Sequence, residues 1–153
     1  MLNDELYILD RKIKEFNNII SEFEKRNFID DLLLREKLND LLGQFEVCLK
    51  NIDFPQKNKR TISAIRYVNN VKKHSKSIFK YSLYTLEIFP SDDLFPSDNL
   101  YPTEFKIWWN ELPLDKKEYS HQYNCYNEEL LNKDLLESIN DIYNLVKEMK
   151  KSV

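Results

Sequence analysis

One histidine of this sequence lies close to asparagine and lysine residues with which it could form a catalytic group. His74 lies four residues after Asn70 and directly after Lys73. An imidazole can transfer a proton near neutral pH, and a cation beside it can hold a phosphate. Hydrolysis of RNA through its 2′-hydroxyl requires both abilities. The alternative is structural: on a helix, His74 would lie beside Tyr67 and Ile78 and pack against them.

The sequence that ends at this histidine, NNVKKH, resembles the signature of the HEPN superfamily. The usual motif has an arginine, a polar residue that is often asparagine, a few further residues and a histidine. Asn70 and His74 match at this spacing, whereas Asn69 stands in the place of the arginine and Arg66 lies too far upstream. HEPN proteins are small helical bundles of bacterial toxins and antiphage systems, and many are metal-independent ribonucleases. The resemblance implies an endoribonuclease that acts as a dimer, with His74 transferring the proton and Asn70 and Lys73 on the phosphate.

The histidine belongs to a segment that is rich in basic residues. No Asp or Glu occurs between Asp53 and Glu87. At 100° per residue, residues 61–83 would form an amphipathic helix with an apolar side and a basic outer side. The basic face predicted for this helix consists of Arg66, Lys72, Lys73, Lys76 and Lys80.

Two interpretations of this basic face are open. Clustered lysine and arginine side chains attract phosphate groups, so RNA is one candidate partner. The formal net charge of −3 at pH 7 argues against RNA. We favour the second interpretation, in which the acidic segment that follows in the chain folds back over the basic helix. The acidic residues of that segment are Glu87, Asp92, Asp93, Asp98 and Glu104.

An insertion rich in aromatic and acidic residues is expected at residues 84–124. Residues 82–89 and 103–109 are rich in β-forming side chains and predict a small β-hairpin or two extended strands. Between them, a unit of aromatic residue, proline, hydroxyl residue and acid recurs. Because aromatic residues are enriched in protein interfaces, the insertion predicts a protein partner. Alternatively, its aromatic side chains close an open end of the helical bundle. The candidate partner-binding residues are Phe89, Phe95, Tyr101, Trp108 and Trp109.

Three other stretches with helical periodicity must support these groups. Apolar residues recur at spacings of three and four along residues 2–23 and 34–48, and the short polar turn between them predicts a long antiparallel helix hairpin. Asp30 or Asp31 is the expected N-cap of the second helix, and Asp134 that of a C-terminal helix. The predicted fold class is therefore mainly α: a four-helix-type bundle in one domain, residues 1–153, with the insertion between its third and fourth helices.

The composition excludes several classes of protein. A chain of 153 residues with one glycine cannot contain a Rossmann or P-loop phosphate site. Its cysteine and histidine residues are too scattered for a zinc site, so we predict no metal and no cofactor; they are Cys48, His74, His121 and Cys125. No apolar run is long enough to span a membrane. We therefore expect a cytoplasmic protein with reduced cysteines and no membrane partner.

These observations favour a non-enzymatic protein-interaction module that binds its partner through the aromatic insertion and the adjacent basic helix. The HEPN resemblance, with a composition typical of an AT-rich genome, indicates an accessory or counter-factor in bacteria–phage or toxin–antitoxin conflict. The alternative function is that of the HEPN-type, metal-independent ribonuclease, which would act as a homodimer with His74 exposed in a basic groove.

Overall fold

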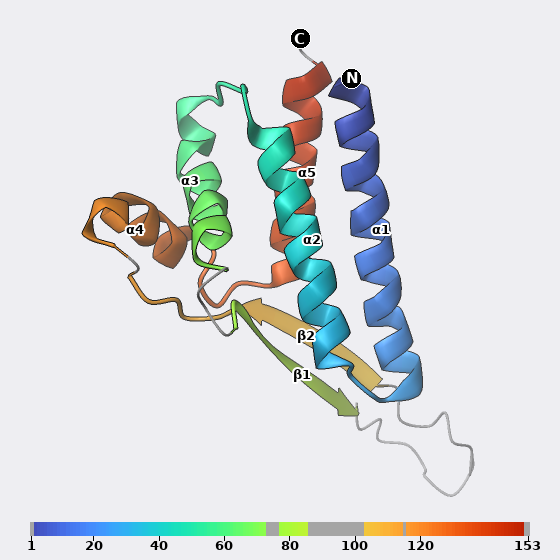
Figure 1. The fold of residues 1–153 in the computed structure, drawn as a ribbon. Helices are drawn as coiled ribbons and strands as arrows, with labels where there is room; N and C mark the ends of the chain where they lie inside the picture. The colour runs from blue at the N-terminus through green and yellow to red at the C-terminus, as the bar shows by residue number, and fades with distance from the viewer. Residues whose placement is uncertain (1, 73–76, 86–102, 115, 152–153) are drawn as a thin grey trace, which may run out of the picture.

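The computed structural model describes residues 2–72, 77–85, 103–114 and 116–151. Within these residues the chain forms five α-helices, a short 3-10 helix and a two-stranded antiparallel sheet between the third and fourth helices (Figure 1). The predicted mainly α class with a small β-hairpin is therefore confirmed. The elements are α1 (Leu2–Arg26), α2 (Asp31–Leu49), α3 (Gln56–Val71), β1 (Phe79–Thr85), β2 (Thr103–Trp109), η2 (Lys117–Tyr119), α4 (Ser120–Glu129) and α5 (Leu135–Lys151).

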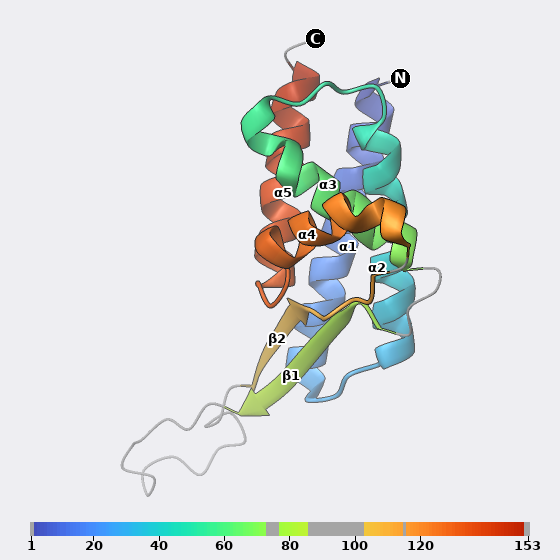
Figure 2. The ribbon, with the colours of Figure 1, turned by 90° about the vertical axis from the view of Figure 1, so that its left-hand side faces the viewer.

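The three longest helices stand side by side, and the two shorter helices pack on one flank of them. Figure 1 shows α1, α2 and α5 with nearly aligned axes, and Figure 2 shows α4 lying across α3. Both termini lie at one end of the bundle, whereas the α1–α2 turn and the sheet lie at the other (Figure 1). No helix in the described part of the chain is long and apolar enough to span a membrane.

The predicted antiparallel hairpin of α1 and α2 is present, and its turn is built by specific residues. Asn27 adopts a left-handed backbone conformation with φ 53°, and the Phe28 N–H donates to the Phe23 carbonyl at 3.2 Å. This pattern is a Schellman motif, which ends α1. Asp30 then caps α2, because its carboxylate accepts a hydrogen bond from the Leu33 N–H at 3.1 Å. Asp30 and Asp31 were both predicted as possible N-cap residues of this helix, and Asp30 is the one that caps it.

The predicted basic helix is wrong in its bounds. α3 begins at Gln56, with Pro55 as its N-cap residue, and ends at Val71. The strand β1 begins at Phe79, so the second half of the predicted helix 61–83 is not a continuation of α3. Ile78 and Phe79 are buried, as the helical prediction required, but they are buried at the start of a strand. Apolar residues in this position fit both periodicities, and pairing with a distant strand decides between them.

The number of helices also differs from the prediction. The stretch after Pro113 is polar and rich in tyrosine, a composition that predicts a loop with one helical turn. It instead contains α4, a helix of 10 residues. Its buried residues are Cys125 and Tyr126, and it packs on α3. The predicted insertion 84–124 therefore starts after the first residues of β1 and ends within α4.

The two strands form a regular ladder that runs from Phe79 opposite Trp109 to Thr85 opposite Thr103. The strand predicted at residues 103–109 is confirmed, and β1 starts before the other predicted run. Phe105, Ile107 and Trp109 are buried on one face of β2. Rings of adjacent strands meet on that face, because Tyr81 stacks on Phe105 with ring centroids 5.9 Å apart.

Two buried tyrosines hold the segment that leaves the sheet. The Tyr67 hydroxyl of α3 donates to the Pro113 carbonyl, and the Tyr126 hydroxyl of α4 donates to the Asn110 carbonyl. The Tyr126 ring also meets Trp109 edge-on, with centroids 6.5 Å apart. Sheet, α3 and α4 are therefore joined through one aromatic cluster. Burial, followed by the nearby Tyr67, raises the pKa of Tyr126 well above its ordinary value of 10.0.

The variant Tyr126→Phe is expected to lower the free energy of unfolding by about 1 kcal/mol near neutral pH, because the Asn110 carbonyl loses its donor. A raised pKa in the folded state means that this stabilisation is complete below pH 10.0 and is lost as pH rises above it. The difference between wild type and variant should therefore shrink above that pH. Urea unfolding of both proteins at neutral pH and at about pH 11 measures this; an equal difference at both pH values would contradict it.

Candidate interaction surface

The described residues of the HEPN-like motif make structural contacts. Asn69 is buried, with 7% of its surface exposed. Its amide nitrogen donates to the Ile65 carbonyl at 3.4 Å, and its amide oxygen has no hydrogen-bond partner within the described residues. Asn70 is exposed and donates to the Gln122 side chain of α4 at 3.1 Å. Lys73 and His74 lie outside the described residues.

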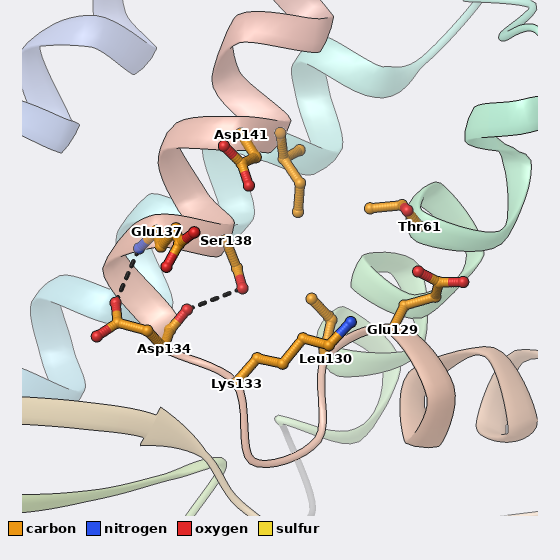
Figure 3. A pocket seen from close by; sticks show the side chains of 9 residues that line it. Thr61, Glu129, Leu130, Lys133, Asp134, Glu137, Ser138 and Asp141 are labelled. Carbon is orange, nitrogen blue, oxygen red and sulfur yellow. Dashed lines mark hydrogen bonds between the residues drawn. The ribbon is translucent and has the colours of Figure 1, made fainter.

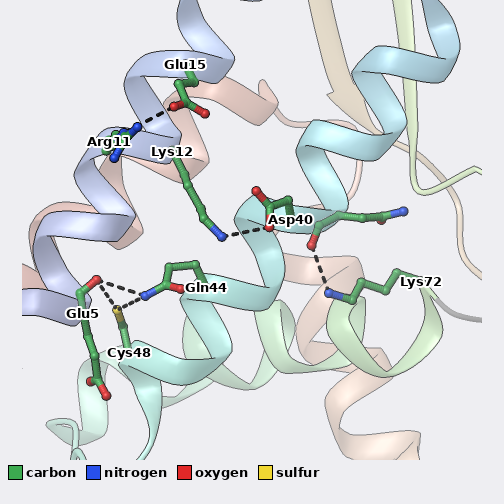
Figure 4. A network of polar contacts seen from close by, with 9 residues as sticks. Glu5, Arg11, Lys12, Glu15, Asp40, Gln44, Cys48 and Lys72 are labelled. Atoms are coloured by element: carbon green, nitrogen blue, oxygen red, sulfur yellow. Dashed lines mark hydrogen bonds and ion pairs between the residues drawn. The ribbon is translucent and has the colours of Figure 1, made fainter.

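The residues predicted to form one basic face point to different partners. Arg66 donates to the Leu49 carbonyl at 3.4 Å, at the C-terminal end of α2. Lys72 donates to a second α2 carbonyl, that of Asn39, at 3.2 Å (Figure 4). Lys80 stands on β1 and donates to the Asn132 side chain at 2.6 Å. A continuous basic helical face is therefore not formed by these three residues, and Lys76, with Lys73, lies outside the described part of the chain.

The acidic segment that was expected to cover this face has one residue in the described chain. Glu104 stands on β2, where its carboxylate is 3.8 Å from the Lys106 ammonium. That ion pair links two residues of one strand, so it provides no contact to α3. The other acidic residues, Glu87, Asp92, Asp93 and Asp98, lie outside the described residues.

The aromatic residues predicted to bind a partner separate into three groups. Trp109 is fully buried, with 0% of its surface exposed, and belongs to the cluster with Tyr126. It is therefore unavailable to a partner, which corrects its assignment. Trp108 is half-buried and lies on the opposite face of β2, because successive side chains of a strand alternate. Phe89, Phe95 and Tyr101 lie outside the described residues.

The largest exposed apolar side chains of the described chain include two at the turn between α1 and α2. Phe28 is 65% exposed and Leu32 is 75% exposed. The Schellman motif places Phe28 next to Phe23, which is buried. Leu32 lies on the first turn of α2, four residues after Phe28. We call Phe28, Leu32 and the pocket beside them the hairpin-tip surface.

The exposure of Phe28 follows from how α1 ends and α2 begins. Asn27 reverses the chain through its left-handed conformation, and the bond from the Phe28 N–H to the Phe23 carbonyl fixes the next residue. Asp30 must then reach the first turn of α2 as its cap. This short connection leaves Phe28 at the outer side of the turn. The α1–α2 turn by itself therefore forms this part of the hairpin-tip surface, and no further helix or strand is needed.

The pocket of the hairpin-tip surface is mainly apolar and has a volume of about 300 Å³. Its charged rim is neutralised from within the chain: Glu22 lies 3.5 Å from Arg26 and 3.8 Å from Lys25, and Asp30 is used as the α2 cap. A pocket of this kind favours an apolar side chain over a charged ligand. The lining residues are Asn18, Ile19, Glu22, Phe23, Arg26, Phe28, Asp30 and Leu33.

A second hollow, of about 420 Å³, lies between the start of α5 and the facing ends of α3 and α4 (Figure 3). Asp141 lines its α5 side, opposite Thr61. Figure 3 shows that Asp134 is engaged in capping, because it accepts from the Glu137 N–H at 2.9 Å. This bond confirms the predicted cap of the C-terminal helix. The Asp134 carboxylate in this hollow therefore has a structural role as the N-cap of α5.

A polar network at the other end of the bundle is also structural (Figure 4). The Gln44 amide and the Cys48 thiol both donate to the Glu5 carbonyl, at 3.0 Å and 3.5 Å. The Lys150 ammonium lies 3.5 Å from the Glu5 carboxylate, so α1, α2 and α5 meet there. Burial raises the pKa of Cys48, which opposes formation of a reactive thiolate.

The residues considered for zinc do not form a site in the described chain. His121 Nε2 lies 3.7 Å from Cys125 Sγ on one face of α4. Burial raises the pKa of Cys125. Within the described residues, no group of three or more His, Cys, Asp or Glu side chains is arranged to hold a metal ion.

Comparison of the chain with models of known protein families, with curated proteins and with solved structures gave no match. The candidate surface therefore depends on the geometry of this chain. Sequence reasoning missed it, because Phe28 and Leu32 read as part of a polar turn and of a helix start. The signal available was an aromatic residue outside the apolar stripe of either helix.

The variant Asn69→Leu is expected to raise the free energy of unfolding by about 1 kcal/mol, because it replaces a buried, unpaired oxygen with an apolar group of similar size. The matched control Asn70→Leu alters the neighbouring exposed position and should change stability by about 0.5 kcal/mol or less. Urea unfolding measures both. A loss of stability in Asn69→Leu would show that the amide has a favourable role in the core.

Proposed function

We propose that this protein is a non-enzymatic protein-interaction module and that its partner docks on the hairpin-tip surface. The observation that carries the proposal is the exposure of Phe28, which lines an apolar pocket, together with that of Leu32 four residues later in the chain. Large apolar side chains that gather at an exposed site mark interaction surfaces. Burying each of them against a partner would contribute about 1.5–3 kcal/mol.

The charged residues around the hairpin-tip surface indicate a partner whose binding site is not strongly charged. The carboxylates and cations on its rim already pair within the chain, so a strongly charged partner gains little there. Apolar anchors that enter a pocket dominate many protein interfaces. The partner that fits best is a protein that offers one large apolar side chain to the pocket and covers Phe28 and Leu32.

The sheet ends beside this surface. The Tyr81 hydroxyl of β1 donates to the Asp31 carboxylate at 3.0 Å, and the Phe105 N–H of β2 donates to Glu24 of α1 at 3.0 Å. The segment with the predicted aromatic contacts is joined to the strand ends, which lie near the α1–α2 turn (Figure 1). The proposal therefore keeps Phe89, Phe95 and Tyr101 as further candidate contacts. The half-buried Trp108 stands at the opposite end of β2, across from Lys80, and would be a contact of a larger partner only.

The biological setting and the alternative function depend on the HEPN resemblance. We propose an accessory or counter-factor in bacteria–phage or toxin–antitoxin conflict. A ribonuclease would need the residues of the motif free to hold a phosphate. Asn69 is buried, and Asn70 is bonded to Gln122. Arg66 is bonded to the end of α2. These contacts favour the interaction function over the ribonuclease.

The double variant Phe28→Ser/Leu32→Ser tests the docking surface. Immobilised wild-type protein should retain a stoichiometric partner from an extract of the source cells, and the affinity for that purified partner should fall at least about a hundredfold in the double variant. Leu114→Ser is the matched control, because it removes an exposed leucine elsewhere on the chain. A partner whose affinity is unchanged by the double variant would place the docking site elsewhere.

Incubation with RNA tests the alternative. The wild-type protein and His74→Ala, purified in the same way, should both leave pooled cellular RNA intact in the presence of EDTA. Cleavage by the wild type that is lost in His74→Ala would support the ribonuclease and overturn the non-enzymatic function.

A further inference from the structure

The backbone groups of β1 alternate between the two edges of the strand, and the register shows which residues face which edge. The Asn110 N–H donates to the Ile78 carbonyl at 3.0 Å, in continuation of the ladder. Residues of a hydrogen-bonded pair recur at every second position of an antiparallel ladder. The even-numbered residues of β1 therefore face β2. The backbone groups of the odd-numbered residues Phe79, Tyr81, Leu83 and Thr85 face the opposite, outer edge.

Other parts of the chain bond to the outer edge of β2 on either side of Ile107. The Phe105 N–H donates to the Glu24 carboxylate at 3.0 Å. At the end of the strand, the Trp109 N–H donates to the Lys133 carbonyl at 3.2 Å, and the Asn132 N–H donates to the Trp109 carbonyl at 3.1 Å. Bonds of this kind prevent a foreign strand from pairing with an edge.

The outer edge of β1 lacks such bonds within the described residues. The one bond there joins the Ser77 hydroxyl to the Phe79 carbonyl at 2.5 Å. In the described chain, the outward N–H groups of Phe79, Tyr81 and Leu83 and the outward carbonyls of Tyr81 and Leu83 have no hydrogen-bond partner. A row of outward donors and acceptors is complementary to another extended backbone.

We infer that β1 pairs in antiparallel fashion with β1 of a second copy of this chain, which gives a four-stranded sheet across a two-fold axis at Tyr81. The inference goes beyond the proposed function, because it concerns another surface and another partner. A two-fold axis requires a self-complementary strand, and the residues of β1 meet this requirement.

The register follows from the backbone and from charge. With Tyr81 opposite Tyr81 of the second copy, Phe79 lies opposite Leu83, so three of the outward residues take part in hydrogen-bonded pairs. On the other face, Lys80 then lies opposite Ser82 of the second copy. A shift of the axis to Lys80 would place two lysines directly opposite each other, which is unfavourable. The Tyr81 register is centred on these three residues and keeps the lysines apart. A shift of the axis to Ser82 would pair Phe79 with Thr85 instead, and the variants below distinguish the two registers.

The mass of the purified protein, measured by sedimentation equilibrium over a range of concentrations, tests the inference. The expected result is a reversible change from the 18.5 kDa monomer to twice that mass. In the dimer, hydrogen exchange should slow at the outward Tyr81 and Leu83 amides as the concentration rises, whereas the Ser82 amide should be protected in both states. A mass that stays at 18.5 kDa up to the solubility limit would overturn the inference. It would also be overturned if these amides became protected only when a strand of another protein binds.

A charge-reversal cycle tests the register. Ser82→Lys places a lysine opposite Lys80 of the second copy, twice per dimer, and should weaken dimerisation about tenfold. Adding Lys80→Glu gives an attractive pair across the interface and should recover the affinity, although the introduced lysine still faces Lys106 of its own chain. Lys80→Glu alone is the control and should have little effect. Failure of the double variant to recover the affinity would overturn the Tyr81 register, provided that circular dichroism shows each variant folded.

Discussion

The arrangement of this molecule depends on the hydrogen bonds from two buried tyrosine hydroxyls to the segment that follows β2. Tyr67 holds the Pro113 carbonyl and Tyr126 holds the Asn110 carbonyl. A buried hydroxyl without a partner would be costly, so these bonds allow only a narrow range of positions for the segment. They fix the end of β2 against α3 and α4. Because β2 is fixed on that side and on the side of Glu24, β1 is the strand with an outward edge.

The parts of the fold that could be predicted from the sequence are those in which local periodicity and burial agree. Leu9, Phe16 and Leu38 lie on regular apolar stripes and are fully or almost fully buried, so α1 and α2 follow from spacing alone. The stripe of residues 61–83 continues through Phe79, and nothing local distinguishes a helix from a strand there. The pairing of Phe79 with its partner on β2 decides it. Similarly, α4 has a small apolar face, and its packing on α3 cannot be read from its own sequence.

The candidate site was harder to predict because exposure depends on the whole fold. Adjacent tryptophans in a strand must face opposite sides, so the sequence could have indicated that only one of Trp108 and Trp109 would reach the surface. The position of Phe28 outside both apolar stripes was a signal, but it does not by itself show exposure, because a phenylalanine in a turn can equally be covered by another element. The same limit applies to the basic residues: Arg66 and Lys72 bind α2 carbonyls that lie far away in sequence.

The two proposed surfaces would affect each other through the geometry of the sheet. Antiparallel pairing of β1 with its copy would direct the Thr85 ends of the two strands in opposite directions, and each hairpin-tip surface lies near one of these ends (Figure 1). A dimer would thus present two tip surfaces at opposite ends of one sheet. Such an arrangement binds a partner with two sites more tightly than one tip can. Weak contacts at a small apolar pocket would then be sufficient, because the second contact forms at a high effective concentration.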